Sequence, residues 1–350
     1  MQAGNPGAVA IMGAGSIGCY VGGRLATAGA TVQLIGRPRL REAVQQHGLH
    51  LTDLHGFDQQ LPVGGCEFHT SAACAARCAL VLVCVKSAAT ADAGRQLAEA
   101  LAAHPSNQRP LVISLQNGIG NADVLREQLP DTTVLPGMVP FNVVQSAPAR
   151  FHQGTEGALE VQADDALKPW RALFAAAGLN LIEHEAMRPV QWAKLLLNLN
   201  NAVNALSDLP LQTQLSQRAY RRCVALAQRE GLQMLALEGI EPARLTPVPP
   251  RWIPRLLSAP DWLFRRLAKR MLEIDPLARS SMWEDLQAGR LTEVDWLNGE
   301  IVRLAARHGR KAPINACLQS LVHEAEQGRQ RSWSGPALLQ RLQSAVAAPA

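Results

Sequence analysis

The stretch that decides the fold of the N-terminal half is AVAIMGAGSIGCYVGGRLATAG, residues 8–29. Residues 8–12 are apolar and predict a short strand, which runs directly into a Gly-x-Gly-x-x-Gly turn at 13–18. The residues after the turn have helical character. Strand, glycine turn and helix in this order are typical of a dinucleotide-binding α/β fold. We therefore expect the N-terminal half to form a Rossmann-type domain.

The glycine turn is the first candidate cofactor site. Its three glycines permit a tight turn, a close approach of backbone to a pyrophosphate and close packing of helix on strand, while the helix N-terminus favours an anion. The alternative is a turn that is merely tight. In this context we expect a dinucleotide to contact the whole turn, which consists of Gly13, Ala14, Gly15, Ser16, Ile17 and Gly18.

The second predicted strand, Thr31 to Ile35, ends in Gly36 and Arg37. An NAD-binding protein usually carries an acid about 20 residues after the glycine loop, whereas an arginine there can hold the 2′-phosphate of NADP. Arg37 therefore favours NADPH over NADH as the cofactor. Two further arginines, at 39 and 41, are either helpers or solvated surface residues at a helix start.

Polar residues follow the next two predicted strands, 80–85 and 111–115. Lys86 comes after the first, and Gln116 and Asn117 come after the second. Ligands of open parallel sheets bind outside the carboxyl ends of the strands. Lys86 and Asn117 are therefore expected on the nicotinamide side. Either could instead cap a neighbouring helix, which is the interpretation we favour for Gln116.

The remainder of the first domain is predicted to extend the sheet. We expect a strand at 133–135, a loop at 136–144 and a helix around 166–177. The segments 151–162 and 179–185 alternate like antiparallel strands. The expected fold is therefore a mainly parallel sheet with an antiparallel extension, in a domain that covers residues 1–187.

The second half has a wholly helical pattern, predicted as a domain at 188–345 with a flexible tail at 346–350. Residues 188–206, RPVQWAKLLLNLNNAVNAL, predict one long helix. At about 100° per residue, Lys194, Asn198 and Asn201 share one stripe among leucines and valines. These polar residues either have a function together, or the lysine extends its ammonium to solvent and the asparagines hydrogen-bond the helix to a loop.

Several further helices are expected after the stripe. Residues 211–237 form a long amphipathic run, and 236–260 are proline-rich and predict an irregular insertion or lid. Residues 261–272 predict a basic amphipathic helix, which packs on its own domain or a dimer mate, or else touches a membrane surface. The sequence does not distinguish a helical core from a dimer interface, so a homodimer stays possible.

The region 280–309 carries a serine and an acid of interest. Ser281 and Glu284 match a capping box, and Glu293 lies near the start of the next helix, where the helix dipole favours an acid. Leu291, Val294, Leu297, Ile301 and Leu304 keep the period of that helix, and Gly309 ends it.

Composition narrows the class of protein. The 350 residues allow two domains, and no apolar run approaches the roughly 20 residues that span a bilayer. No secretion signal is recognisable, so we expect a cytoplasmic protein. The net charge of +5 is dispersed, and a basic cleft for phosphorylated and carboxylated ligands explains it as well as nucleic acid does.

The seven cysteines show no zinc-like pairing, so no metal site is expected and reduced thiols are predicted. Cys74 and Cys78 are four apart and could be a redox pair, although small apolar thiols are common in protein cores.

Taken together, five segments make the chain resemble the ketopantoate reductase (2-dehydropantoate 2-reductase) family over nearly its whole length. They are GAGSIG at 13–18, VKS at 85–87, QNGIGN at 116–121, WAKLLLN at 192–198 and SSMWEDLQAGRLTEVDWLNG at 280–299. The resemblance implies an N-terminal Rossmann domain followed by an all-helical domain, with the active site in the cleft between them.

The resemblance also implies roles for residues of the helical domain. Lys194 matches the catalytic general acid and Asn198 a substrate contact. Ser281 matches a residue that binds the substrate carboxylate, and Glu293 one that organises the site around cofactor and substrate. In the first domain, Arg37 matches the 2′-phosphate contact. The motif residues Lys86 and Asn117 match nicotinamide-side contacts, and we also assign Asn117 to the substrate.

The activity implied is NADPH-dependent reduction of 2-dehydropantoate to pantoate, in pantothenate and coenzyme A biosynthesis. The chain departs from the family pattern at Ala202, where a second substrate asparagine commonly lies. Asn201 and Asn204 flank it, and Asn201 is the better replacement by helical angle. The segment 236–275 is also longer and richer in proline. A reductase of a different 2-oxo acid, or a non-catalytic NADPH-binding sensor, are the alternatives.

Overall fold

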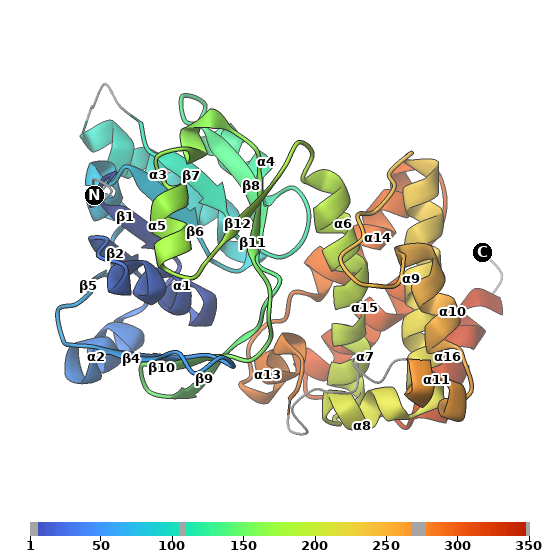
Figure 1. Ribbon diagram of the computed structural model, residues 1–350. Coiled ribbons are helices and arrows are strands. Elements are labelled where there is room, and N and C mark those ends of the chain that lie inside the picture. The colour runs from blue at the N-terminus through green and yellow to red at the C-terminus, as the bar shows by residue number, and fades with distance from the viewer. Residues whose placement is uncertain (1–5, 105–108, 268–277, 348–350) are drawn as a thin grey trace. The chain divides into compact units, whose positions relative to one another are not determined.

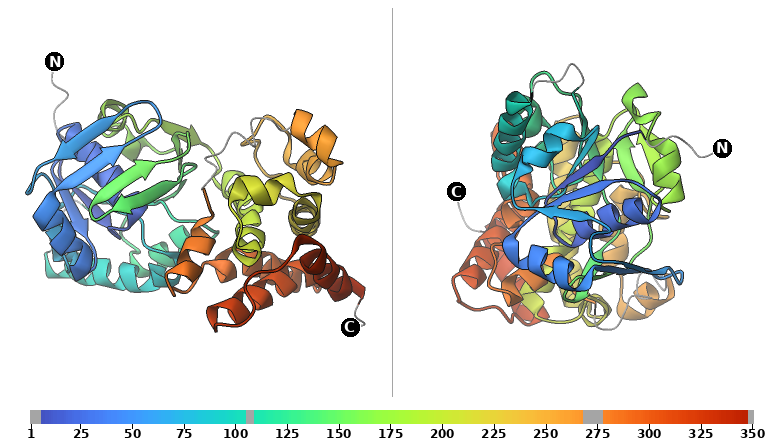
Figure 2. Two further views of the ribbon diagram at one scale, coloured as in Figure 1. Left: turned by 90° about the horizontal axis from the view of Figure 1, so that it is seen from below. Right: turned by 90° about the vertical axis from the view of Figure 1, so that its left-hand side faces the viewer.

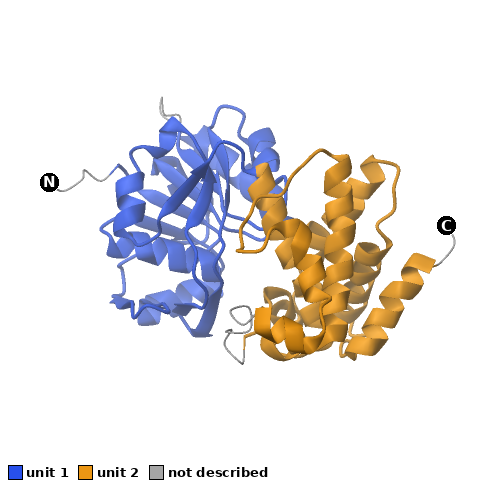
Figure 3. Ribbon diagram, turned by 45° about the vertical axis from the view of Figure 1, so that its right-hand side comes forward, with its two compact units in different colours: residues 1–187 blue, residues 188–350 orange. Residues whose placement is uncertain are grey.

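The computed structural model describes residues 6–104, 109–267 and 278–347. The chain divides into two compact units, Met1–Met187 and Arg188–Ala350 (Figure 3). Unit 1 contains both sheets of the described chain, and the described part of unit 2 is helical. Among the described residues, no helix is both long enough and apolar enough to pass through a bilayer.

The main sheet of unit 1 has eight strands in the order β12-β11-β8-β7-β6-β1-β2-β5 (Figure 1). From β5 to β8 the strands are parallel, and β11 pairs antiparallel with β8 and parallel with β12. The expected mainly parallel sheet with an antiparallel extension is confirmed. Its strands are β1 Val9–Met12, β2 Val32–Ile35, β5 Glu67–His69, β6 Leu80–Val83, β7 Leu111–Ser114, β8 Val134–Met138, β11 Leu159–Gln162 and β12 Leu181–His184.

Strands β1, β6 and β7 are buried along their whole length, because both faces of the sheet are covered. Alternate residues of β1 enter different hydrophobic clusters: Val9 and Ile11 on one face, Ala10 and Met12 on the other. The views in Figure 2 show helices along both faces. The helices and short helical turns of unit 1 are α1 Ser16–Thr27, α2 Pro38–His47, η1 Ala72–Arg77, η2 Ser87–Ala89, α3 Thr90–Ala103, α4 Asn121–Gln128, η3 Asp165–Leu167 and α5 Arg171–Ala176.

A second sheet of four strands was not predicted. Its order is β4-β3-β10-β9, with β4 Asp58–Leu61, β3 Leu49–Thr52, β10 Arg150–Gln153 and β9 Val143–Ala147. The segment 151–162 was expected to extend the main sheet, and it does so only through β11, because β10 pairs with β3 and β9. The loop expected at 136–144 is also wrong at both ends, which belong to β8 and β9.

Unit 2 is built from helices. Its described elements are α6 Arg188–Asn198, α7 Asn200–Ser207, α8 Leu211–Ser216, α9 Arg218–Leu237, η4 Pro250–Trp252, α10 Ile253–Leu257, α11 Asp261–Leu267, α13 Ser281–Gln287, α14 Val294–Arg307, α15 Pro313–Glu326 and α16 Gly335–Ala347. The predicted tail begins too early, because α16 runs to Ala347. The predicted run 211–237 is interrupted at Gln217, and residues 268–272 of the predicted basic helix lie outside the described chain.

The helix predicted at 188–206 is broken. Helix α6 ends at Asn198, Leu199 lies in a turn, and α7 begins at Asn200. Each part has one buried apolar face, and both Trp192 of α6 and Leu199 of the turn are fully buried. The single stripe expected from helical periodicity therefore divides into one part on α6 and another on α7.

All seven cysteines are free, and six of them are buried. The Cys78 thiol donates a hydrogen bond to the carbonyl of Cys74 at 3.5 Å, so these two residues are neighbours without a disulfide. Burial raises the pKa of Cys78 to about 12. A reactive redox thiol needs a lowered pKa, and the redox-pair interpretation is therefore not supported.

Candidate active site

The three glycines of the turn after β1 have three different surroundings. Gly13 has φ +108°, which favours glycine, and its amide bonds the carbonyl of Ile35 at 3.0 Å. A Cβ on Gly18 would lie 2.2 Å from the Gly13 carbonyl oxygen, so this position allows helix α1 to approach the strand. A Cβ on Gly15 would meet nothing within 4 Å. The space beside Gly15 is thus the open part of the turn.

The turn leads into the N-terminus of α1, a helix of 12 residues. Gly15 is the N-cap residue, and no side chain bonds the first amides in its place. The first turn, which contains Ser16 and Ile17, carries no acidic residue. Free backbone N–H groups and the positive end of the helix dipole favour an anion. With Ala14 buried behind it, the turn fits the pyrophosphate of a dinucleotide.

Three candidate side chains follow strands that are neighbours of β1. Arg37 follows β2 and is the exposed N-cap residue of α2. Lys86 follows β6 and is exposed, and Asn117 follows β7 and is half-buried. The sheet order β7-β6-β1-β2 places all three along the edge that carries the glycine turn. Parallel strands end at the same edge, which is where such sheets bind ligands.

A buried polar network, which the sequence reasoning missed, ties the loops after β6 and β7 together. The Ser87 hydroxyl and the Asn121 amide both donate to the Asn117 carbonyl, at 2.9 and 2.7 Å. Thr90 donates to Asn121 Oδ1 at 2.8 Å, and Gln116 Nε2 donates to the Thr90 hydroxyl at 2.6 Å. Gln116 was predicted to cap a neighbouring helix, but neither α3 nor α4 has a side-chain cap, and Gln116 bonds the hydroxyls of Ser114 and Thr90 instead. Both loops, and hence Lys86 and Asn117, are held by this network.

In unit 2, the polar candidates Lys194 and Asn198 lie on α6 and Asn201 on α7. All three are half-buried. A lysine at this depth can keep its charge while part of its stem packs on apolar neighbours. Because Leu199 interrupts the helix, the orientation of Asn201 relative to Lys194 depends on the geometry of the break as well as on helical period.

Two serines lie at the start of α13, and their positions differ from the prediction. Ser280, not Ser281, is the N-cap residue, and its hydroxyl accepts the Trp283 amide at 3.2 Å. Ser280 is buried, and Ser281 begins the helix and is exposed. The capping box predicted for Ser281 and Glu284 is wrong, because the N-cap lies one residue earlier and the third residue after it is Trp283, which has no carboxylate. The hydroxyl of Ser281 is not needed for the cap, which leaves Ser281 suited to a ligand.

The two asparagines beside Ala202 have different environments. Asn204 is fully buried: its Oδ1 accepts the Ser280 amide at 2.9 Å and its Nδ2 donates to the Leu209 carbonyl at 2.9 Å. Asn201 is half-buried, and its backbone carbonyl accepts the Ser280 hydroxyl at 3.3 Å. The Asn204 amide is therefore occupied in holding the start of α13 against α7, and Asn201 is the better candidate for the substrate.

Glu293 is the half-buried N-cap residue of α14, as expected for an acid near a helix start. The residues around it are held by α15: Glu326 Oε1 accepts the Thr292 amide at 2.8 Å, and His323 bonds both Glu326 and Asp295 at 2.9 Å. Burial lowers the pKa of His323, but the two carboxylates together outweigh it and raise that pKa above its ordinary value.

Leu291 was predicted to lie on the apolar face of α14. It precedes the helix and is 76% exposed, whereas Val294, Leu297, Ile301 and Leu304 are buried as predicted. Among the described residues, no group of three or more histidine, cysteine or acidic side chains is placed to hold a metal ion.

Comparisons with known proteins agree over both units. A family model described as "Ketopantoate reductase PanE/ApbA" matches residues 9–165, and one described as "Ketopantoate reductase PanE/ApbA C terminal" matches residues 186–326. The 2-dehydropantoate 2-reductase of Halobacterium salinarum is 29% identical over 325 residues, which cover 91% of this chain and 98% of that protein.

Solved structures give the same result. A PanE/ApbA family ketopantoate reductase from Ralstonia eutropha JMP134 is 32% identical with a TM-score of 0.76, and the match covers 92% of this chain and 99% of that one. D-Mandelate dehydrogenase with NADH and anilino(oxo)acetate has the same fold, with a TM-score of 0.72 at 22% identity over 91% of this chain and 98% of that one. The chain belongs to the ketopantoate reductase family.

Proposed function

We propose that the protein reduces 2-dehydropantoate to pantoate with NADPH, a step of pantothenate and coenzyme A biosynthesis. The observation that carries the proposal is that one chain of this family combines an open glycine turn in unit 1 with Lys194 and Asn198 on one helix of unit 2. Binding alone would require the first of these features but no proton donor.

The cofactor assignment depends on Arg37. It is exposed directly after β2 and caps α2 through its backbone, so its guanidinium is available to a phosphate. A planar guanidinium pairs well with phosphate oxygens, and no acid takes its place at the end of β2 to favour a free ribose hydroxyl. Lys86 and Asn117 are assigned to the nicotinamide side of the cofactor.

NADPH, when bound, supplies the hydride that adds to the ketone carbon of the substrate. Negative charge then develops on the carbonyl oxygen, and we assign Lys194 the task of answering it. Its ammonium stabilises that oxygen and donates the proton from Nζ, which yields the hydroxyl of the product. A positioned proton donor accelerates such a step by roughly 10²–10⁴-fold, and a fixed cation adds electrostatic stabilisation.

The substrate contacts are assigned to polar groups that add no second cation beside Lys194. The amides of Asn198 and Asn201, with Asn117 of unit 1, align the substrate by hydrogen bonds. The hydroxyl of Ser281 and the amides at the start of α13 suit its carboxylate. We assign Glu293 one of two tasks, to hold Lys194 charged and oriented or to accept a substrate hydroxyl; a carboxylate beside an ammonium favours its charged form.

The test is NADPH oxidation, followed by absorbance, with a panel of 2-oxo acids. The proposal is supported if kcat/KM is higher for ketopantoate than for every other acid of the panel. A higher kcat/KM for another branched or aromatic 2-oxo acid supports a reductase of that acid, a possibility that Ala202 favours because the family commonly has asparagine there. NADPH binding without turnover of any 2-oxo acid contradicts the enzymatic proposal and indicates a sensor.

A further inference from the structure

The break between α6 and α7 leaves part of the helical hydrogen-bond ladder open. The last four carbonyls of a helix have no intrahelical partner, and in α6 these include the carbonyls of Leu195 and Leu196. The Leu199 amide reaches the Leu195 carbonyl at 3.0 Å. The Leu196 carbonyl accepts a hydrogen bond from Gln228 Nε2, also at 3.0 Å. A side chain from α9 thus stabilises the break.

A second residue of α9, Gly231, also lies against the break between α6 and α7. Gly231 lies three residues after Gln228 and therefore on the same face of α9. A Cβ on Gly231 would lie 2.7 Å from Leu196 Cδ2 and 3.7 Å from Leu199 Cδ1. The absence of a side chain there allows α9 to approach the broken segment. On α9, Gln228 therefore donates the hydrogen bond that the Leu196 carbonyl lacks within α6, and Gly231 leaves space for the side chains of Leu196 and Leu199.

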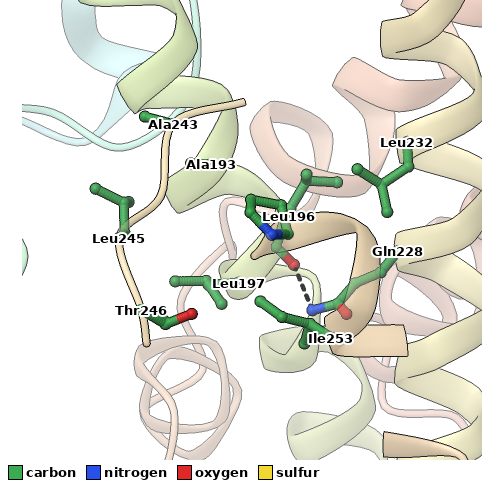
Figure 4. Close-up of a pocket in the computed structure, with 10 residues that line it drawn as sticks. Ala193, Leu196, Leu197, Gln228, Leu232, Ala243, Leu245, Thr246 and Ile253 are labelled. Carbon is green, nitrogen blue, oxygen red and sulfur yellow. Dashed lines mark hydrogen bonds between the residues drawn. The ribbon is translucent and has the colours of Figure 1, made fainter. Parts of the chain in front are cut away.

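Gln228 also borders a small pocket behind α6, which Figure 4 shows with the bond to Leu196 as a dashed line. Only 4% of Gln228 is exposed, and its Oε1 has no hydrogen-bond partner in the described protein. The pocket is small, because the centre of a water molecule has only about 10 Å³ in which to lie. Its other walls include Ala193 and Leu197 of α6 and Leu245 and Thr246 of the proline-rich segment.

The proline-rich segment is bonded to the start of α6 as well. The Ala243 amide donates to the Pro189 carbonyl at 3.0 Å. The rear of α6 is therefore held in two places, by this segment at the first turn and by Gln228 at the last turn. Together these contacts fix the direction in which α6 leaves the break.

We infer that Gln228 is a positioning residue for Lys194. The break lies between Lys194 and Asn198 on one side and Asn201 and the Ser280–Ser281 pair on the other, and a change of angle at Leu199 moves these groups relative to one another. Gln228 touches neither cofactor nor substrate in this role. The inference rests on the proposed function, since that function makes the relative placement of these groups matter.

The first experiment compares Gln228→Leu with a control on the same helix. Leucine keeps the volume but cannot donate, so we expect kcat to fall about tenfold or more while the Kd of NADPH stays unchanged. The control is Glu230→Gln, because Glu230 is also buried but accepts the amides of Ile314 and Asn315 on α15. It should lower Tm and leave kcat within about twofold. An equal loss of kcat in both variants would overturn the inference.

Gln228→Glu provides a pH readout within one folded protein. A carboxylate cannot donate to the Leu196 carbonyl, whereas the protonated acid can, and burial raises the pKa of a glutamate at this position. The ratio of kcat of this variant to that of the wild type should therefore rise as the pH falls from about 8 to about 6. A ratio that stays flat across this range contradicts the proposed hydrogen bond.

Amide hydrogen exchange tests the hold on the break without any turnover. The amides of residues 199–203 should exchange faster in Gln228→Leu and at the wild-type rate in Glu230→Gln. Unchanged exchange in Gln228→Leu rejects the inference even if ketopantoate is the substrate. If the wild type reduces no 2-oxo acid, the proposed function fails; a selective increase in exchange then still shows that Gln228 holds the break.

Discussion

The two units place their candidate residues by different means. In unit 1 each candidate follows a strand of one parallel sheet, and the glycine turn offers backbone N–H groups within six residues of sequence. In unit 2 the placement depends on side chains that bond across 32 residues, from Gln228 to Leu196, and across 76 residues, from Asn204 to Ser280. Candidate residues that act through the backbone should be sensitive to substitutions that add side-chain atoms. Those that depend on side-chain hydrogen bonds should be sensitive to substitutions that remove them.

The largest expected effect comes from removing the amine of Lys194. Lys194→Ala should lower kcat by roughly 10²–10⁴-fold while NADPH binds with unchanged affinity, because the proposed proton donor lies in unit 2, whereas the glycine turn and Arg37, which we propose to bind the cofactor, lie in unit 1. Stopped-flow turnover and NADPH fluorescence titration measure the two quantities separately.

Lys168→Ala is the matched control for Lys194→Ala. Its ammonium is exposed and pairs with Asp165 at 2.7 Å, so both kcat and NADPH affinity should stay at the wild-type values. A Lys194→Ala variant with near-normal turnover would break the assignment of the acid to unit 2.

The next effect is on cofactor preference. Arg37→Ala should weaken NADPH by about 10–100-fold and leave NADH nearly unaffected, because only NADPH carries the 2′-phosphate. The measurement is KM for each cofactor under the same substrate concentration. The exposed Arg39, on the first turn of α2, provides a graded comparison, and Arg39→Ala should cost less. Equal losses for both cofactors would show that Arg37 does not touch the 2′-phosphate.

Two glycine variants sharpen the comparison within unit 1. In Gly18→Ala the new Cβ meets a backbone oxygen, so the free energy of unfolding should fall by about 1–3 kcal/mol. In Gly15→Ala the Cβ enters open space, so Tm should hold while NADPH affinity falls. Thermal unfolding without cofactor and a cofactor titration separate the two effects. Equal destabilisation by both variants would contradict the different roles assigned to these glycines.

The smallest effect concerns pH. The folded pKa of His323 is raised, so its stabilising contribution is complete below the unfolded value of about 6.5 and is lost as the pH rises through the folded pKa. The side chain is 37% exposed, and solvent screening keeps the contribution to about 1 kcal/mol or less. Urea unfolding at several pH values measures the difference in the free energy of unfolding between the wild type and His323→Gln. This difference should fall as the pH rises through the folded pKa of His323, and a difference that stays constant would contradict the prediction.

The contrast between the units also explains what the sequence could predict. Strand, glycine turn and Arg37 depend on residues that are close in sequence, and their spacing predicts the parallel sheet and the residues at its edge. The second sheet escaped prediction because β10 pairs with β3, about 100 residues earlier, and no local pattern indicates that register. The buried bonds of Ser87, Asn121 and Gln116 were missed for the same reason, although all three residues lie in the motifs that carried the resemblance.

In unit 2 the helices were predicted, but their breaks were not. Leu199 continues the apolar period, and nothing near it in sequence indicates that the ladder stops there; the donor that stabilises the break is on α9. The capping residue was placed one position late, because Ser280 and Ser281 are chemically alike. The long-range bonds that Ser280 donates, from its amide to Asn204 Oδ1 and from its hydroxyl to the Asn201 carbonyl, distinguish the two. Long-range side-chain contacts decided both positions.

The buried thiols allow the unfolding of each unit to be followed by chemical labelling. Alkylating reagents attack the thiolate, and burial raises the pKa of Cys66, Cys84 and Cys223 to about 12. The folded chain should therefore react slowly, and each thiol should label when its surroundings open. Five cysteines belong to unit 1, and Cys223 and Cys317 belong to unit 2. Mass spectrometry of the labelled peptides would then give a separate opening rate for each unit of the native enzyme.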